Sequence, residues 1–389
     1  MKIQADKRGR IYQIMKFTVD QKVFSKALSD VGRAVTQKSL VPILSGIKVI
    51  AEDEGITLIG TNSDIIIKRF ISRDITSRNI SIEQIGSAVV SERYFTELIR
   101  KLPEDVHIEV SATQVIKVRS GDIFTQLNGF RADEYPQLPE IDQTNLIGMD
   151  ANELKEIIKQ TVFATAKNET RPVLTGVHFT FSNNKLTAVA TNSQRLASRI
   201  NEVHVSNETS FIVPSSSLNE LVKQISDYSG IVKMYSADGY ILFETDEISL
   251  YSRLISGQYP NTSKLIPNEQ KTVLTLDREI LVKGIDRACL FASEWKNNNI
   301  TLSIKNRKLC ISSGSSEMGS IQELQEIKDL SGDDDLKISI DGHFLKEALH
   351  TIMDEEINIK FNGSMRPIVI VSTHQKSSYL HLISPVRSF

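Results

Sequence analysis

The sequence has few cysteines and no long apolar run. Its 389 residues include two cysteines, Cys289 and Cys310, and one tryptophan. Two cysteines cannot supply the disulfide framework of a small secreted protein, so we expect buried thiols in a reducing compartment. No segment approaches the ~20 consecutive apolar residues of a membrane span, and the first residues lack the apolar core of a signal peptide. The chain is therefore predicted to be cytoplasmic.

An excess of positive charge is also missing. Lysine and arginine number 46, aspartate and glutamate 48, and the formal net charge is −2. Proteins that bind nucleic acid tightly through its phosphates usually have a basic excess. Tight, charge-driven binding over the whole surface is therefore excluded. Any contact with DNA must depend on a few locally placed basic side chains.

Motifs of catalysis and of metal binding are absent as well. The sequence contains no P-loop, GxGxxG, HExxH or CxxC pattern, and its seven histidines lack the spacing of metal ligands. The segments 333–335 and 314–319 are expected to be solvated loops. We predict a non-catalytic protein with no metal and no cofactor. An enzyme whose active site assembles from distant residues is an alternative.

An internal repeat is present. Val41–Ile47 returns as Arg171–Val177, and Leu58–Ser63 returns as Ala188–Ser193, both after 130 positions. A weaker third copy covers 300–304 and 308–312. Self-similarity at a fixed spacing indicates one structural unit used several times. The sequence therefore predicts three pseudo-repeats.

Each repeat reads as helix, strands, helix, strands. In the first helix the apolar side chains of Phe24, Ala27, Leu28 and Val31 recur at helical spacing. Thr18, followed three residues later by glutamine, predicts a capping box at its start. The fold class is therefore α+β, with two helices packed on antiparallel sheet in each domain. We predict domains at 15–143, 144–268 and 269–389, after a disordered leader at 1–14.

Basic residues recur on the polar faces of these helices. Lys22, Lys26 and Arg33 form one stripe on the first helix. The first helices of the other repeats carry Lys155 with Lys159 and Lys283 with Arg287, and the later helix of the first repeat carries Arg93 and Arg100. A solvated helix face explains any one stripe. Its return in all three repeats favours a surface that contacts phosphates weakly and without sequence specificity.

The ordered set of segments resembles a known family. It comprises Met15–Val19, Pro42–Leu44, Ala190–Leu196, Phe211–Pro214, Tyr259–Pro260 and Leu382–Arg387. Over nearly its whole length the chain resembles the bacterial DNA polymerase III beta subunit, the replicative sliding clamp. The resemblance implies a head-to-tail homodimer of three-domain crescents that closes into a six-domain ring around duplex DNA. It also implies binding to the DNA polymerase III alpha subunit, the clamp loader, other DNA polymerases and repair proteins.

The resemblance places a cleft for clamp-binding peptides between the second and third domains. It has aliphatic walls, an aromatic, an adaptable methionine and arginine at the rim. The matching residues are Leu174, Thr191, Arg195, Leu196, Pro260, Leu265, Phe344, Met365, Pro367, Leu382, Ile383, Pro385, Val386 and Arg387. Core packing is the alternative for each alone, but an apolar chain end such as Pro385–Arg387 would fray unless it docked.

The resemblance also implies a DNA-facing surface and a dimer seam. Lys38, Asn168 and Arg171 lie in loops that the family turns toward DNA and join the helical basic residues. The seam joins a first-domain edge strand to a third-domain strand. Its residues are Asp122, Ile123, Phe124, Thr125 and Leu127 on one side, and Lys308, Leu309, Cys310 and Ile311 on the other.

Two departures from the family pattern bear on these sites. Asn192-Ser193-Gln194 stands where relatives often have Asp-Gly-His, and Pro172-Val173 stands where they have an aromatic pair. The first changes the floor of the cleft, and the second removes an aromatic expected at DNA. A repeat-built scaffold that binds peptides but no DNA is a second alternative.

Overall fold

The structure is a computed structural model. It describes residues 4–5, 11–12, 14–36, 41–73, 79–168, 170–205, 207–237, 239–267, 269–292, 298–315, 319–373 and 379–386. The chain forms two compact units, one of residues 1–151 with 220–253 and one of residues 152–219 with 254–389. They are called unit 1 and unit 2 below. None of the helices in the described ranges combines the length and apolar character needed to span a bilayer.

Unit 1 is built on one antiparallel sheet of thirteen strands. Its strand order is β12 (Ile147–Asp150), β17 (Ile231–Ala237), β18 (Tyr240–Glu244), β19 (Ile248–Arg253), β6 (Ile65–Ser72), β5 (Gly55–Thr61), β4 (Gly46–Glu52), β8 (Gly86–Ser91), β11 (Ile123–Phe130), β10 (Val115–Ser120), β9 (Val106–Val110), β3 (Met15–Val19) and β7 (Ile80–Gln84). The β6–β19 ladder joins strands of the first and second predicted domains. The short strands β1 (Gln4–Ala5) and β2 (Ile11–Tyr12), within the predicted leader, pair with each other.

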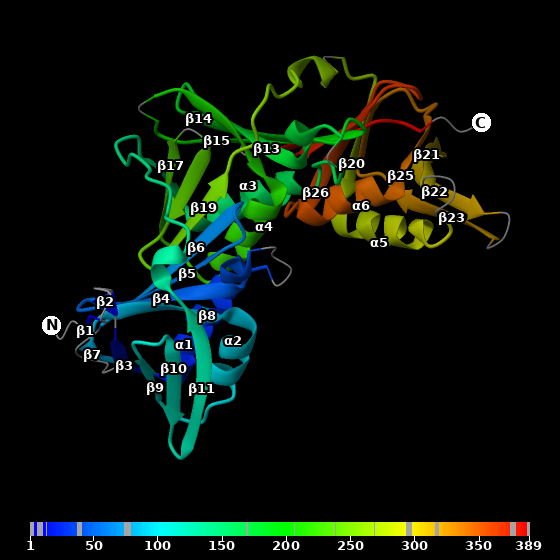
Figure 1. The fold of residues 1–389 in the computed structure, drawn as a ribbon. Coiled ribbons are helices and arrows are strands. Elements are labelled where there is room, and N and C mark those ends of the chain that lie inside the picture. Colours follow the sequence, from blue (N-terminus) through cyan, green and yellow to red (C-terminus); the bar gives the residue numbers. More distant parts are fainter. Residues whose placement is uncertain are drawn as a thin grey trace. The chain divides into compact units, whose positions relative to one another are not determined.

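Two helices, α1 (Gln21–Gly32) and α2 (Glu92–Arg100), pack together in unit 1 and contact β4 (Figure 1). The predicted apolar stripe of α1 is the face that is buried. The predicted capping box at Thr18 is wrong, because Thr18 lies in β3 and the Asp20 carboxylate caps the helix by accepting a bond from the Val23 amide. Phe24 packs edge-on between Phe17 and Phe95, so the core couples both helices to the sheet.

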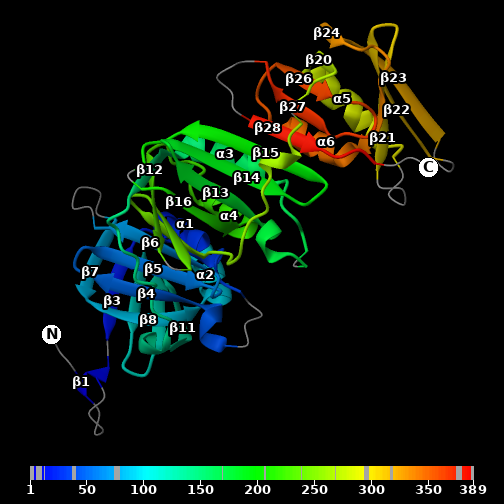
Figure 2. The same ribbon diagram turned by 90° about the horizontal axis from the view of Figure 1, so that it is seen from above.

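Unit 2 contains a nine-stranded and a four-stranded sheet. The larger sheet runs β16 (Thr209–Pro214), β13 (Gly176–Ser182), β14 (Lys185–Thr191), β15 (Arg195–Glu202), β28 (Tyr379–Ile383), β27 (Ile368–Ser372), β26 (Glu356–Phe361), β20 (Thr272–Asp277) and β24 (Asp329–Gly332). The smaller runs β23 (Gly319–Glu326), β22 (Lys308–Ser315), β21 (Asn299–Lys305) and β25 (Lys337–Asp341). Figure 2 shows β15 beside β28, the pairing that joins the second and third predicted domains.

The remaining helices begin where the repeats predict them. They are α3 (Ala151–Val162), α4 (Ser215–Gln224), α5 (Arg278–Cys289) and α6 (Gly342–Thr351). Helices α5 and α6 pack on each other over an aliphatic core that includes Leu281, Ile285 and Leu345. Asp277 and Asp341 cap them through side-chain oxygens, the third repeat's counterpart of Asp20.

The repeat is confirmed at the level of single hydrogen bonds. In unit 1 the Thr61 hydroxyl bonds the Ile65 carbonyl at 3.0 Å, and in unit 2 the Thr191 hydroxyl bonds the Arg195 carbonyl in the same way. The next residue in each copy is an asparagine that accepts two backbone amides, and the third is a serine at positive φ. One turn, Thr-Asn-Ser, therefore connects the same two strands in both copies.

Candidate functional site

An apolar cluster lies in unit 2 where the ladders of β13, β14 and β15 meet those of β27 and β28. Its buried members are Leu174, Val189, Leu196, Ile212, Tyr259, Val369 and Leu382. Three residues predicted for the cleft, Leu174, Leu196 and Leu382, are therefore brought together. They come from positions 174 to 382 of the chain, and the β15–β28 ladder pairs Leu196 directly with Leu382.

Tyr259 is a member of this cluster that the sequence prediction did not include. Its hydroxyl oxygen accepts a hydrogen bond of 3.1 Å from the backbone amide of Thr191, and its ring stacks on His178 with centroids 4.9 Å apart. Burial raises the pKa of Tyr259 and keeps it neutral. Tyr259 thereby holds Thr191, a predicted cleft residue, in place. The signal was the Tyr-Pro pair that also ends the first repeat at Tyr135-Pro136.

Two large apolar side chains of the predicted cleft are exposed. Leu265 is 50% exposed and Met365 is 61% exposed. Pro260 is also exposed, while Pro367 is half-buried. Large apolar side chains in water favour a binding surface when they adjoin other apolar residues. The residues predicted for the cleft therefore include both buried and exposed apolar side chains.

Arg195 was expected at the rim of the cleft and is instead buried, with 3% of its side chain exposed. Its guanidinium lies 4.3 Å from the ring centre of Phe344 and 5.2 Å from that of Phe163. It donates to the Phe163 carbonyl and to the carboxylate of Glu347. A buried cation is tolerated when it is paired and hydrogen-bonded. Arg195 is therefore a structural link between the residue that follows α3 and helix α6.

A cavity of about 600 Å³ opens beside Arg195 and Phe344. The Thr-Asn-Ser turn, the loop after α3 and the start of α6 line it, and Asn192, Gln194 and Asp341 make it polar. Asn168, which was predicted to face DNA, lines the same cavity. The structure therefore brings a predicted DNA-loop residue and two predicted cleft residues into one depression of unit 2.

The segment 384–386, the last described part of the chain, is docked. Pro385 forms a β-bridge with Ile340, and the Val386 amide donates to the Ser339 carbonyl at 2.8 Å. The Ser384 amide donates to the Gln194 carbonyl at 2.8 Å, which ties the tail to the wall of the cavity. Ile383, the cleft residue before this tail, is buried in the third-repeat core. Arg387 lies outside the described residues.

The basic residues of unit 1 lie on exposed helix faces, as their spacing predicts. Lys22, Lys26, Arg33, Arg93 and Arg100 are all exposed. Some are already engaged within the chain, since Arg33 lies 3.7 Å from Glu220 and Arg100 lies 2.8 Å from Glu97. Lys38 lies outside the described residues.

The residues of unit 2 that were predicted to face DNA differ in their exposure and in their ion pairs. Lys159, Asn168 and Arg171 are exposed, while Lys155 is half-buried. Lys283 is 2.7 Å from Glu279, and Arg287 makes two bonds to Glu323 of β23 at 2.7 and 2.8 Å. These pairs reduce the positive charge available to phosphate, so any contact with DNA through them is weak.

One half of the predicted dimer seam fits an edge strand and the other does not. In β11 the stretch 123–128 pairs only with β10, and Ile123 and Phe124 are 42% and 50% exposed. Strand β22, with Lys308, Leu309, Cys310 and Ile311, is paired on both sides, and its last three named residues are buried. The edge strand next to β22 is β23, where Leu324 is 53% exposed, and the opposite edge strand, β25, is bridged by Pro385. β22 therefore cannot offer an edge.

Comparison with known proteins covers almost the whole chain. Three family models match it in order: the N-terminal domain of the DNA polymerase III beta subunit over 15–139, its central domain over 148–261 and its C-terminal domain over 263–387. The beta sliding clamp of Bacillus subtilis is 37% identical over 380 residues, covering 96% of this chain and 100% of the relative. That of Halalkalibacterium halodurans is 36% identical, with coverage of 96% and 100%.

Solved structures agree with the sequence relatives. The crystal structure of the Bacillus subtilis DNA polymerase sliding clamp superposes with a TM-score of 0.93 at 36% identity, covering 96% of this chain and 100% of that one. The beta subunit of Thermotoga maritima DNA polymerase III shares the fold at 22% identity, with a TM-score of 0.86 and coverage of 96% and 100%. The chain belongs to the DNA polymerase III beta subunit family, and it is a processivity clamp of three α+β clamp domains.

Proposed function

We propose that the chain forms a head-to-tail homodimer that closes into a six-domain ring around duplex DNA. The ring holds DNA without sequence specificity, and it tethers the DNA polymerase III alpha subunit, the clamp loader, other polymerases and repair proteins. The chain itself catalyses no step and acts in the cytoplasm. Its domains span 15–143, 144–268 and 269–389, after a leader of 1–14. The observation that carries this proposal is the apolar cluster of unit 2, which includes three predicted cleft residues, in a chain that matches a beta sliding clamp over that relative's whole length.

The cleft is suited to a short apolar peptide. Leu174, Leu196 and Leu382 provide a floor, and the exposed Leu265 and Met365 provide apolar area that a ligand would cover. An unbranched methionine repacks easily, which suits several partners with different side chains. A buried apolar anchor in such a pocket supplies most of the binding energy of a small interface. The partner specificity of the ring therefore resides in this cleft.

Retention on DNA depends on ring closure. The chain has a net charge of −2, and several of its helical cations already pair with carboxylates. Few charges then remain for phosphates, so binding to DNA by charge alone would be weak. A closed ring needs no strong contact, and weak contacts permit sliding.

For the seam we propose edge strands of two different domains. β11 offers a free edge with Ile123 and Phe124, and β23 offers one with Leu324. Exposed edge strands readily pair with another chain. Because the two surfaces differ, their contact is heterologous and must either close into a ring or polymerise. The exposed Ile280 and Leu290, on and after the adjoining α5, extend the β23 side of this surface.

The dimer is tested by mass in solution. Leu324→Lys together with Phe124→Glu places two opposite charges on the two sides of the seam. Each single variant should shift the chain from dimer to monomer in analytical ultracentrifugation, and the double variant should recover part of the dimer. A chain that is monomeric before any substitution contradicts the seam and the ring.

The DNA-facing surface is tested by charge reversal. Lys26, Arg33, Lys155 and Lys283 are changed to Glu, and loading by a clamp loader onto nicked circular DNA is measured. Loading should fall at least tenfold while peptide affinity, measured by fluorescence anisotropy, stays within twofold. Unchanged loading would favour a peptide-binding scaffold that does not use DNA.

A further inference from the structure

The first strand of the second repeat, β12, has an uncovered edge. In the first repeat β3 pairs with β9 on one side and with β7 on the other. In the third repeat β20 pairs with β26 and with β24. β12 pairs with β17 alone and ends the sheet of unit 1, and no strand of the described ranges pairs with its other edge. Such an edge offers unpaired backbone groups to an added strand.

Repeats one and three place a side-chain hydrogen bond between the first strand and its inner neighbour. The position lies two residues before the aspartate that precedes the first helix of the repeat. In repeat one the Thr18 hydroxyl lies 2.7 Å from Nδ1 of His107, its partner in β9. In repeat three the Thr275 hydroxyl donates to the side chain of Asn358, its partner in β26, at 2.8 Å. Both polar groups of the inner strand are therefore satisfied.

The second repeat has Gly148 at this position, opposite Lys233 of β17. Lys233 is exposed, and its ammonium group makes neither a hydrogen bond nor an ion pair within the described ranges. This includes Glu244, its cross-strand neighbour on β18. The space over Gly148 is open, since only the Ile231 side chain lies within 4 Å of where a Cβ would stand. A cation is therefore accessible across the edge strand.

The covering strands of the other two repeats show what such an edge accepts. Ile82 of β7 and Leu330 of β24 each stand opposite a buried apolar residue of the first strand, and the counterpart of that residue in β12 is the buried Ile147. In repeat three a charge also reaches across the first strand. Lys328, the residue before β24, pairs at 2.7 Å with Glu356 of the inner strand β26.

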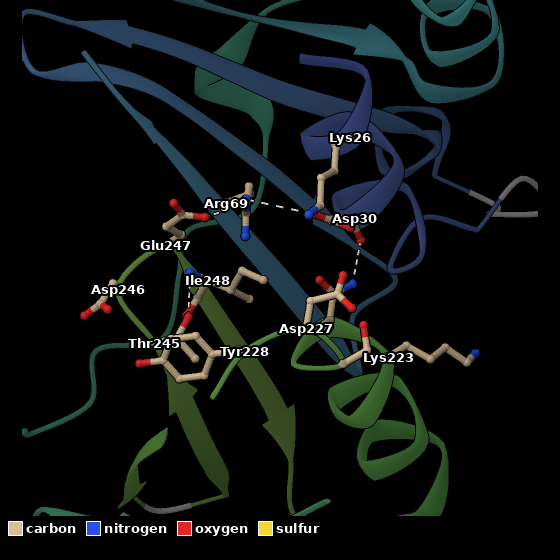
Figure 3. A pocket seen from close by; sticks show the side chains of 12 residues that line it. Lys26, Asp30, Arg69, Lys223, Asp227, Tyr228, Thr245, Asp246, Glu247 and Ile248 are labelled. Atoms are coloured by element: carbon tan, nitrogen blue, oxygen red, sulfur yellow. Dashed lines mark hydrogen bonds and ion pairs between the residues drawn. The ribbon is translucent and has the colours of Figure 1, made fainter. Parts of the chain in front are cut away.

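Exposed apolar area adjoins the free edge of β12. Leu146, directly before the strand, is 47% exposed, and Ile231, at the start of β17, is 54% exposed. The hydroxyl of Tyr228 donates to the Ile231 carbonyl at 3.3 Å and so fixes this end of β17. Tyr228 also lines a cavity of about 260 Å³ with Thr245 and Asp246 (Figure 3). An added strand would cover the two apolar side chains, which is favourable.

We propose that the free edge of β12 binds an extended segment of another protein as an additional antiparallel strand. This segment carries a glutamate opposite Gly148 and aliphatic residues on either side of the glutamate. Two strand spacings of about 4.8 Å each separate it from β17, a span that glutamate and lysine side chains bridge together. Backbone bonds supply the affinity, and the side chains select the sequence. The proposal does not rest on ring closure, on DNA or on the cleft.

The probe is a labelled peptide, acetyl-Asn-Ile-Glu-Ile-Ser-Gln-amide, which keeps the isoleucines of β7 and has glutamate in place of the serine between them. It is titrated into the whole clamp without DNA. Fluorescence anisotropy measures the affinity, and hydrogen–deuterium exchange locates the binding. We expect saturable binding with slower exchange at residues 146–150. Glutamine in place of the glutamate should weaken binding at least threefold, because the pair with Lys233 is lost.

A reversal of charge in the protein makes the test specific. Lys233→Glu, at an exposed position, should weaken binding of the glutamate peptide at least threefold and should favour the same peptide with lysine instead. The matched control, Lys185→Glu on β14, is also exposed and should leave both affinities within twofold. Absence of saturable binding, slower exchange only outside residues 146–150, or equal effects of the two substitutions would overturn the proposal.

Discussion

Repeats one and two meet in unit 1, and repeats two and three meet in unit 2. The two junctions contain the same structural elements but differ in their side chains. Each has a Thr-Asn-Ser turn, a ladder between neighbouring repeats and an apolar cluster that contains a Tyr-Pro tyrosine. In unit 1 Ile66 pairs with Tyr251, while in unit 2 its counterpart Leu196 pairs with Leu382. A tyrosine ring fills space that leucine leaves open.

The first residue of the strand that follows the turn also differs between the two junctions. Unit 1 has Ile65, a buried aliphatic side chain, and unit 2 has Arg195 at the equivalent position. Arg195 lies next to a cavity of about 600 Å³, and the exposed Leu265 and Met365 belong to the same unit. The same turn and ladder therefore occur in both junctions. The proposed peptide cleft belongs only to the junction in unit 2, where leucine and arginine replace tyrosine and isoleucine.

The largest expected effect comes from removing Arg195. In Arg195→Met the contacts to Phe163 and Phe344 lose their charge, and the bond to the Phe163 carbonyl is lost. Glu347 is 46% exposed and can be solvated, so we expect unit 2 to lose about 2–4 kcal/mol of unfolding free energy. Urea denaturation measures this loss. Arg253→Met on unit 1, an exposed arginine, is the control and should cost under about 1 kcal/mol.

The next largest effect is expected from deleting the docked tail. Deletion of residues 385–389 removes the bridge to Ile340 and the bond to Ser339. We expect the affinity for a clamp-binding peptide to fall at least tenfold, or about 1.4 kcal/mol, because the tail adjoins the cavity wall at Gln194. The dimer should persist in ultracentrifugation. Unchanged peptide affinity in an anisotropy titration would refute the assignment of the tail to the cleft.

Acid should lower the stability of the junction in unit 2 more than that of the junction in unit 1. The cause is His381, whose counterpart in unit 1 is the buried Leu250. Burial lowers the pKa of His381 to about 3, against an ordinary value of 6.5. The unfolded chain therefore takes up the proton first, so this part of the stability is complete above pH 6.5 and is lost as the pH falls toward 3. The slope is roughly 1.4 kcal/mol per pH unit at most.

The substitution that tests this effect is His381→Leu. Its unfolding free energy should depend less on pH between 6.5 and 4 than that of the unmodified chain, because the titrating group is gone. Urea denaturation at several pH values measures the two slopes. Leu250→Val, a conservative change on unit 1, should leave the slope unaltered. Parallel curves for the histidine variant and the unmodified chain would show that His381 is not the responsible group.

The two tyrosines should behave alike. Tyr259→Phe leaves the Thr191 amide without its acceptor, so we expect a loss of about 1–3 kcal/mol. The Tyr135 hydroxyl donates to the carbonyls of Gly46 and Ile59 at 3.3 and 3.2 Å, and its oxygen accepts from the Thr61 backbone amide. Tyr135→Phe leaves that amide without its acceptor and should also cost about 1–3 kcal/mol. A loss in only one of the two variants in thermal denaturation would contradict this account.

Periodicity in the sequence predicted the repeat, the α+β class and the buried stripe of α1, because each depends on neighbours within one element. The errors concern neighbours that are distant in sequence. The burial of Arg195 depends on Phe163 and Glu347, and the interior position of β22 depends on β23, whose edge no local pattern reveals. The basic residues were predicted as exposed, but their pairing with acids such as Glu323 was not. Family resemblance supplied the cleft residues that local patterns could not.

The central claim is that DNA is held by closure of the ring. The most direct measurement is the half-life of loaded clamp on nicked circular DNA before and after the circle is cut once with a restriction enzyme. The account predicts stable retention on the circle, even at raised salt, and rapid loss from the free ends of the linear product. Equal half-lives on circular and linear DNA would contradict it.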